Sequence, residues 1–313
     1  MIGPIYLVYL DFMALRLGIL GLSEGNGHPY SWSAIFNGYR PEILKNSGFP
    51  AISEYLARQK FPDDQLPQAQ VTHIWTQELA LSQHIASACH IPNVVATHTE
   101  MLGHVDAILL ARDDAENHFE MAQAFLDAGL PVYIDKPLAY DVKTAQEIFS
   151  LEKYPGQIFS CTAMRFAREF QISQSYLESH IGRVSHVDAK VMKSWPKYAV
   201  HVIEPTLQIL DHPNQIRTSQ VCCAQDRLQM WVEWEDGRTA SFTCLGSLST
   251  PVQINLFGRK GFLELVSKDT FYAFRGALRT FVEVALTRNN PISSAHVLDI
   301  VRLIEIGILK TSI

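Results

Sequence analysis

The chain has 313 residues, of which 47% are hydrophobic and 19% charged, and its formal net charge at pH 7 is −6. This length suits two domains, and the composition is typical of a soluble globular protein. The acidic balance and the lack of any block of Lys and Arg argue against a nucleic-acid partner. The five cysteines show neither metal-ligand nor disulfide spacing, which favours reduced thiols in a cytoplasmic protein.

Residues 1–13 are mostly apolar, but they lack a basic start and are shorter than the about 20 residues that a membrane span requires. We therefore interpret residues 1–13 as an N-terminal extension, with Met13 as a candidate natural start. No membrane or targeting segment is expected in the chain.

The first predicted strand covers residues 15–20, and a glycine-rich turn at residues 21–27 follows it. Pro29 suits the first position of a helix that extends to about Tyr39. The glycine spacing is G-x-x-x-G-x-G, which alone favours a structural turn. Combined with the strand–helix–strand unit described below, it predicts a pyrophosphate loop at a helix N-terminus. Its cofactor-binding residues would be Gly21, Ser23, Gly25 and Asn26.

The same turn matches G-x-S-x-G, the nucleophile motif of α/β-hydrolases. A serine nucleophile there would need an upstream strand and loop to supply the oxyanion hole, and the sequence has neither. A serine hydrolase is therefore disfavoured, and Ser23 is expected to face a cofactor phosphate.

A second strand is predicted at residues 71–75, before a helix at about residues 79–89, so that residues 38–70 form an insertion. In a simple dinucleotide fold an acidic residue near the end of this strand binds the ribose hydroxyls. Thr76 and Gln77 take this position, and neither is acidic or basic. The sequence therefore leaves NAD and NADP open as cofactors.

Residues 105–111 form an apolar run typical of a buried parallel strand, and residues 119–126 show helical spacing before Gly129. A second short strand covers residues 131–134. The polar segment Asp135-Lys136-Pro137 follows it directly. This βαβ unit places Lys136 at the carboxyl ends of the strands, where open α/β sheets bind ligands.

The unit resembles the Gfo/Idh/MocA family, named after glucose-fructose oxidoreductase and inositol dehydrogenase. The residues that coincide with the family pattern are Asp106, His118, Ala128, Gly129, Val132 and residues 136–139, while Asp135 replaces a glutamate. Family members are mostly NAD(P)-dependent oxidoreductases of sugars and polyols. The resemblance implies that Arg112, His118, Asp135 and Lys136 lie at the cofactor. From the residues alone, Arg112 could instead pair with Asp113 or Asp114, and His118 could be structural.

Residues 227–235 alternate between apolar and polar side chains, and Asp236-Gly237 predicts a two-residue hairpin turn. With further strands at residues 186–193, 238–245, 252–257 and 262–266, this predicts a large, mostly antiparallel sheet. The expected fold is an α/β Rossmann-type dinucleotide-binding domain at residues 14–137, followed by an α+β substrate and dimerisation domain at residues 138–313. The resemblance implies that the last helix, at residues 294–310, packs back on the first domain.

The family also carries a D-x-G-x-H-x-x-D motif on a helix across its active site. His201 takes the place of the histidine and Glu204 that of the last acid, while Lys197 and Ala199 replace the first aspartate and the glycine. Arg165 takes the place of an arginine over the substrate. Without the resemblance, a buried core histidine and a solvated lysine would be the better interpretation of His201 and Lys197.

These patterns predict an NAD(P)-dependent oxidoreductase that transfers hydride between nicotinamide and a CH–OH carbon of a sugar, sugar nucleotide or polyol. Lys136 and His201 would handle the hydroxyl proton. Lys197, Arg165 and Glu204 would contact the substrate, which the cations predict to be anionic. The expected partners are a small-molecule substrate and further copies of the chain, as a dimer or tetramer.

The competing interpretation is a catalytically silent family member that binds cofactor or sugar as a regulator. Lys197 in the aspartate position and the altered glycine spacing favour it. A metal site is not indicated, because none of the 12 histidines lies in an H-E-x-x-H or comparable spacing.

Overall fold

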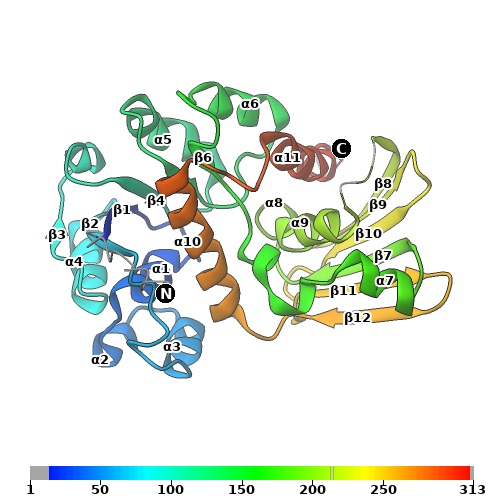
Figure 1. The fold of residues 1–313 in the computed structure, drawn as a ribbon, viewed down its shortest axis with the longest axis horizontal. Coiled ribbons are helices and arrows are strands. Elements are labelled where there is room, and N and C mark those ends of the chain that lie inside the picture. Colours follow the sequence, from blue (N-terminus) through cyan, green and yellow to red (C-terminus); the bar gives the residue numbers. More distant parts are fainter. Residues whose placement is uncertain (1–13, 212, 214, 311–313) are drawn as a thin grey trace, which may run out of the picture.

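The computed structural model describes residues 14–211, 213 and 215–310. The extension predicted at residues 1–13 lies outside this part of the chain. Two six-stranded sheets lie side by side, with helices packed on them and between them (Figure 1). The predicted fold class, a Rossmann-type sheet followed by a mostly antiparallel one, is confirmed.

The first sheet is entirely parallel and has the strand order β3-β2-β1-β4-β5-β6. Strands β4 and β5 are buried along their whole length, which explains the apolar runs of the sequence. The strands are β1 Leu15–Leu20, β2 Ala69–Trp75, β3 Asn93–Val94, β4 Ala107–Leu110, β5 Val132–Ile134 and β6 Ile158–Phe159. Because β6 pairs with β5, this sheet extends beyond the boundary predicted at residue 137.

The order of the strands reverses between β1 and β4, and such switch points are where open α/β sheets bind ligands. The helices around this sheet are α1 His28–Asn37, α2 Pro41–Leu44, α3 Pro50–Ala57, α4 Leu79–Ala88, α5 His118–Asp127 and α6 Val142–Ser150. Helices α2 and α3 occupy the predicted insertion at residues 38–70. Short 3₁₀ helices are η1 His98–Met101, η2 Ala115–Asn117, η3 Ala163–Phe166 and η4 Arg168–Phe170.

The second sheet has the order β12-β11-β7-β10-β9-β8 and is antiparallel except for the β7–β10 pair. Its strands are β7 Val184–Val191, β8 Ile216–Ala224, β9 Arg227–Trp234, β10 Thr239–Cys244, β11 Gln253–Gly258 and β12 Phe262–Val266. The alternation predicted for β9 is confirmed, since Leu228, Met230, Val232 and Trp234 are buried. Helices α7 Gln174–His180, α8 Trp195–Tyr198 and α9 Val200–Ile209 accompany this sheet.

The last two helices connect the two cores. Helix α10, Thr270–Thr287, lies between the sheets and supplies Phe271, Ala277, Leu278, Phe281, Val282 and Val284 to the core of the first (Figure 1). Helix α11, Ser294–Leu309, adds Val297 and Val301 to the first core and Ile300, Leu303 and Ile304 to the second. In the described part of the chain, no helix is both long and apolar enough to cross a membrane.

Candidate active site

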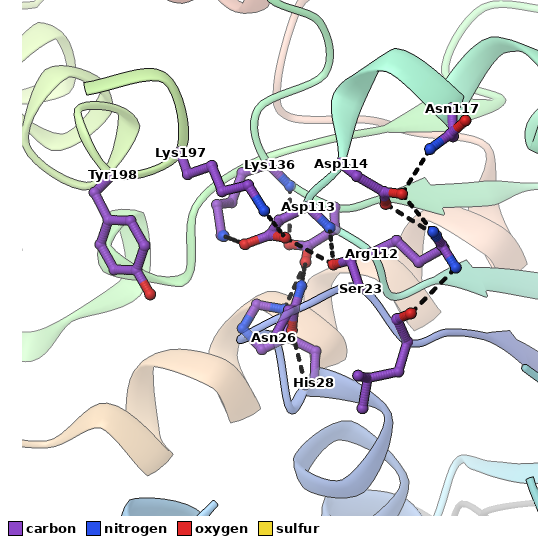
Figure 2. Close-up of polar contacts among 12 residues, drawn as sticks. Ser23, Asn26, His28, Arg112, Asp113, Asp114, Asn117, Lys136, Lys197 and Tyr198 are labelled. Atoms are coloured by element: carbon purple, nitrogen blue, oxygen red, sulfur yellow. Dashed lines mark hydrogen bonds and ion pairs between the residues drawn. The ribbon is translucent and has the colours of Figure 1, made fainter. Parts of the chain in front are cut away.

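Polar side chains gather where the first sheet meets α8 and α9. The loops that follow β1, β4 and β5 emerge at one edge of the sheet, because parallel strands share one direction. They carry residues 21–27, 111–117 and 135–139. Figure 2 shows these loops facing Lys197 and Tyr198 of α8 across a cleft, with Asp113 between them.

The glycine-rich turn after β1 has the features of an anion cradle. A Cβ atom on Gly21 would lie 2.2 Å from Cγ of Pro29, so that only glycine lets the turn pack against the start of α1. Gly25 has a φ of +75° and open space where a side chain would be. Within the described residues, no hydrogen-bond partner occupies the backbone N–H groups of Ser23, Glu24, Gly25 and Gly27. These donors suit a pyrophosphate.

The Ser23 hydroxyl, which was predicted to face a cofactor phosphate, is bonded to Asp113 instead. Ser23 Oγ donates to Asp113 Oδ1 at 2.7 Å and accepts from the Asp113 backbone N–H at 3.0 Å. Both side chains are buried. A hydroxyl that donates to a carboxylate is not free to donate to phosphate, so that Ser23 fixes the loop after β4 to the glycine turn instead.

Asn26 connects the glycine turn to Asp135. Its side-chain N–H donates to Asp135 Oδ2 at 2.8 Å, and its Oδ1 accepts from the His28 backbone N–H at 2.8 Å. Asn26 is therefore buried in the wall of the site, behind the surface that a cofactor would contact.

Arg112 makes an intramolecular ion pair, the alternative left open by the sequence. Its guanidinium binds the Asp114 carboxylate through Nε at 2.9 Å and through Nη2, and it donates to the Leu22 carbonyl at 3.2 Å. Asn117 also donates to Asp114, at 2.7 Å. Arg112 is only 5% exposed, so that it stabilises the glycine turn from behind instead of lying on a surface loop.

His118 and Thr76 are structural in this geometry, although both were predicted at the cofactor. The His118 ring is fully buried, with Nδ1 3.0 Å from the Leu138 carbonyl and Nε2 2.9 Å from the Arg112 carbonyl. The Thr76 hydroxyl donates to the Glu78 carbonyl and pairs with Ser82 Oγ, both at 2.8 Å. Their polar atoms are thus used inside the protein. They fix the loop after β4 and the start of α4.

Gln77 lies where a ribose-binding acid would be expected. Its Oε1 accepts from the Leu22 N–H at 3.2 Å, and its Nε2 donates to the Leu22 carbonyl at 3.0 Å. The end of β2 is therefore held against the glycine turn by an amide and not by a carboxylate.

Asp135 is a buried carboxylate with three hydrogen-bond donors around it. It is 1% exposed and accepts from Asn26 Nδ2, from His28 Nδ1 at 2.6 Å and from the Lys136 backbone N–H at 2.8 Å. Burial raises its pKa, but the charges of His28 and Lys136 and the hydrogen bonds outweigh this effect and hold the pKa well below its usual range. Asp135 thus stays ionised and orients its neighbours.

Sequence reasoning did not identify His28, the partner of Asp135. Its ring stacks on Trp32 and meets the edge of Phe274, with centroid distances of 5.0 Å to each. The one available signal was its position at the first residue of a helix that follows a glycine-rich turn.

Lys136 and Lys197 converge on Asp113 from opposite sides of the cleft. Lys136 Nζ lies 3.5 Å from Asp113 Oδ2, and Lys197 Nζ lies 3.1 Å from Oδ1 (Figure 2). The Lys136 side chain is 6% exposed and that of Lys197 31%. Asp113, which the sequence analysis treated only as a possible partner of Arg112, is therefore the acid that joins the two sides.

His201 of α9 lies beside Tyr198. Its Nδ1 is 2.6 Å from Thr162 Oγ1, and its ring centroid is 5.2 Å from that of Tyr198. Burial lowers its pKa well below the usual range, and the charges of Lys136, His28 and Lys193 add to this effect. His201 is therefore uncharged at neutral pH and within the electrostatic reach of Lys136.

Arg165 and Glu204 pair with each other below the cleft. Glu204 is completely buried, accepts from the Thr162 N–H at 2.6 Å and lies 3.5 Å from Arg165 Nη1. Burial raises its pKa to about 7, although Arg165 opposes this shift. The Arg165 guanidinium also lies 3.0 Å from His296 Nε2. Both side chains, predicted to contact the substrate, are thus engaged with each other in this structure, because the buried carboxylate requires a cation beside it.

Comparison with known proteins bears on the fold and the cofactor class. Residues 53–162 match the model of an oxidoreductase family with an NAD-binding Rossmann fold, the Gfo/Idh/MocA family, which confirms the predicted resemblance and cofactor class. No curated protein matches the chain.

Among solved structures, myo-inositol 2-dehydrogenase from Lactobacillus plantarum is 13% identical, with 96% of this chain and 98% of that chain covered and a TM-score of 0.72. GenD2 from gentamicin A biosynthesis, in complex with NAD, is 14% identical over 96% and 94%, with a TM-score of 0.72. An oxidoreductase from Thermotoga maritima is 18% identical over 94% and 95%, with a TM-score of 0.69. At these identities the likeness shows a shared two-sheet fold.

Proposed function

We propose, on the premise that this chain belongs to the Gfo/Idh/MocA family of oxidoreductases, that it transfers hydride between NAD and a CH–OH carbon of a sugar, sugar nucleotide or polyol. The observation that carries the proposal is that Lys136 Nζ and the His201 ring lie 5.7 Å and 5.2 Å from the centroid of the same Tyr198 ring, with Lys136 in the loop after β5, beside the point where the first sheet reverses its strand order. The inositol dehydrogenase among the similar structures favours a polyol or sugar as the substrate class.

The glycine turn fits the cofactor better than its spacing suggests. It combines free backbone N–H groups, the N-terminus of α1 and the open space around Gly25. A bound NAD would supply a ring that accepts or returns the hydride at the substrate carbon. Residues 21–27 and the start of α1 would hold its pyrophosphate.

His201 suits the proton-transfer step of this reaction. Oxidation of an alcohol requires that the hydroxyl proton leaves as hydride departs from the same carbon. An uncharged imidazole can accept that proton, and the Thr162 hydroxyl holds its Nδ1, leaving Nε2 as the nitrogen for substrate. In the reverse direction the same nitrogen returns the proton to the carbonyl oxygen.

Lys136 suits the stabilisation of the substrate oxygen. Its side chain is almost completely buried, and its ammonium group lies 3.5 Å from the Asp113 carboxylate. A cation held in a water-poor site lowers the energy of the oxygen charge that develops during hydride transfer. Asp135 fixes the backbone of Lys136 by accepting its N–H.

Cofactor binding and turnover test the proposal separately. Nicotinamide fluorescence and thermal shifts with NADH and NADPH should show binding of NADH. NAD⁺ reduction should then be screened with myo-inositol, neutral sugars and sugar acids. Lack of binding to any nicotinamide dinucleotide would remove the proposed function. Tight binding without turnover of any CH–OH substrate would favour a silent regulator.

A further inference from the structure

A second pair of residues, Lys193 and Tyr198, extends the cleft beyond the predicted catalytic group. Lys193 Nζ donates to the Tyr198 hydroxyl and lies 4.4 Å from the centroid of its ring. Lys136 Nζ lies 5.7 Å from the same centroid, and the His201 ring 5.2 Å from it. Lys193, Lys136 and His201 therefore all lie near the ring of Tyr198.

The backbone holds Lys193 in an uncommon conformation. Its φ is +67°, in the left-handed region that non-glycine residues rarely adopt. Two hydrogen bonds with Gly246 fix it there, from the Lys193 N–H at 2.7 Å and from the Gly246 N–H at 3.2 Å. Such a conformation is energetically unfavourable and persists only where surrounding contacts enforce it.

The charges of the cleft do not balance around this pair. Lys136 and Lys197 share Asp113, and Asp135 pairs with His28. Among the described residues, Lys193 has no carboxylate within ion-pair distance, and its ammonium contacts only the Tyr198 phenol. Lys193 is therefore the ammonium of this group that lacks a carboxylate partner among the described residues, and its exposure leaves it accessible to a negative group of a ligand.

We propose that Lys193, positioned by Tyr198, binds an anionic group of the substrate, a carboxylate or a phosphate, while a hydroxyl of the same molecule lies between Lys136 and His201. This inference rests on the proposed oxidoreductase function and names the substrate class, a polyhydroxylated carboxylate or phosphate ester. A neutral polyol would leave the exposed Lys193 ammonium to water and gain nothing from its charge.

The test measures probe binding to the full chain, with and without saturating NADH. The probes are D-gluconate for a carboxylate, D-glucose 6-phosphate for a phosphate and D-glucitol for a neutral chain. In wild type, at least one anionic probe should bind about tenfold more tightly than D-glucitol. The better anionic probe identifies the source of the charge.

Variants assign the effect to Lys193. Lys193→Met should remove the preference for the anion and leave NADH affinity within about twofold of wild type. Lys193→Arg should keep most of the preference for the anion, because the positive charge remains. Tyr198→Phe should reduce the preference about threefold, since the ring stays but no longer holds the ammonium. Lys190→Met is the matched control, because Lys190 lies on β7 and pairs with Asp188.

Equal binding of anionic and neutral probes by wild type, or an unchanged preference in Lys193→Met, would overturn the inference and leave the oxidoreductase function standing. If wild type does not bind NADH, the proposed function is contradicted instead. In that case the probe titrations without NADH still show whether Lys193 binds the anion.

Discussion

The two sides of the cleft are built differently. On the side of the first sheet, Ser23, Asn26, Asp113 and Asp135 are almost fully buried, and their side chains bond to one another. On the opposite side, Lys193 and Lys197 are exposed or partly exposed and are held by a phenol and by a carboxylate of the other side.

Under the proposed function, this difference suits the two sides to different tasks. A buried network of hydrogen bonds has one arrangement, which suits a cofactor whose shape is constant. Flexible lysines on the opposite side can adjust to a substrate and exchange the carboxylate of Asp113 for a substrate anion. Lys136 is buried like the residues of the first side, and it carries a positive charge like the lysines of the opposite side.

The largest effect is expected at Lys136, where the two sides meet. Lys136→Ala should reduce turnover by a factor of about 10² or more, because a positioned charge at the reacting oxygen is lost. NADH affinity should change far less. Steady-state kinetics on any substrate found in the screen would measure this, with Lys143→Ala as the control, since Lys143 is 85% exposed on α6. Full activity in Lys136→Ala would refute the mechanism.

The cofactor side can be tested through the backbone alone. Gly25 and Gly48 both have positive φ, +75° and +83°, and both have open space at the Cβ position. Valine should strain both turns similarly, by about 1–3 kcal/mol. Gly25→Val should therefore weaken NADH binding by about thirtyfold, whereas Gly48→Val, between α2 and α3, should bind normally. Fluorescence titration measures both, and equal affinities would place the cofactor elsewhere.

Much of the fold could be predicted because burial leaves a clear pattern. The β4–α5–β5 unit has apolar runs for strands covered on both faces, and Gly129 ends its helix with a φ of +79°. Strand β8 could not be predicted. It is an edge strand with most side chains exposed or half-buried, so that its sequence lacks an alternating pattern.

The site was only partly predictable, for a related reason. Position after a strand or on a helix predicted that Lys136, Lys197 and His201 share the cleft. Their partners are set by packing between distant segments, as in the bond between Ser23 and Asp113. The sequence gives no signal for such pairings. The orientation of the Arg165 side chain could not be predicted either, because it depends on the Glu204 carboxylate, which is buried only in the folded chain.

The pH dependence of unfolding that Glu204 causes reports whether its carboxyl group is shielded from water. Burial raises the pKa of Glu204 from about 4.5 in the unfolded chain to about 7 in the folded chain, so that folding is increasingly opposed as the pH rises from about 4.5 to 7. Below this window both states are protonated, and above it the cost is constant. Glu204→Gln should remove the trend and gain on the order of 2–3 kcal/mol relative to wild type between pH 5 and pH 8. Urea unfolding at several pH values measures it, and parallel pH profiles would show that Glu204 is solvated.

The smallest effect is expected for the ion pair that spans the cleft. Lys197 is 31% exposed, and Lys136 also contacts its partner Asp113, so that water and a second cation weaken the pair. A double-mutant cycle with Lys197→Met and Asp113→Asn should give a coupling of less than about 1 kcal/mol, decreasing with added salt. Urea unfolding at low and high ionic strength measures it. A salt-independent coupling above about 2 kcal/mol would mean that the second side is as fixed as the first. The proposal that the lysines of the opposite side adjust to the substrate would then be wrong.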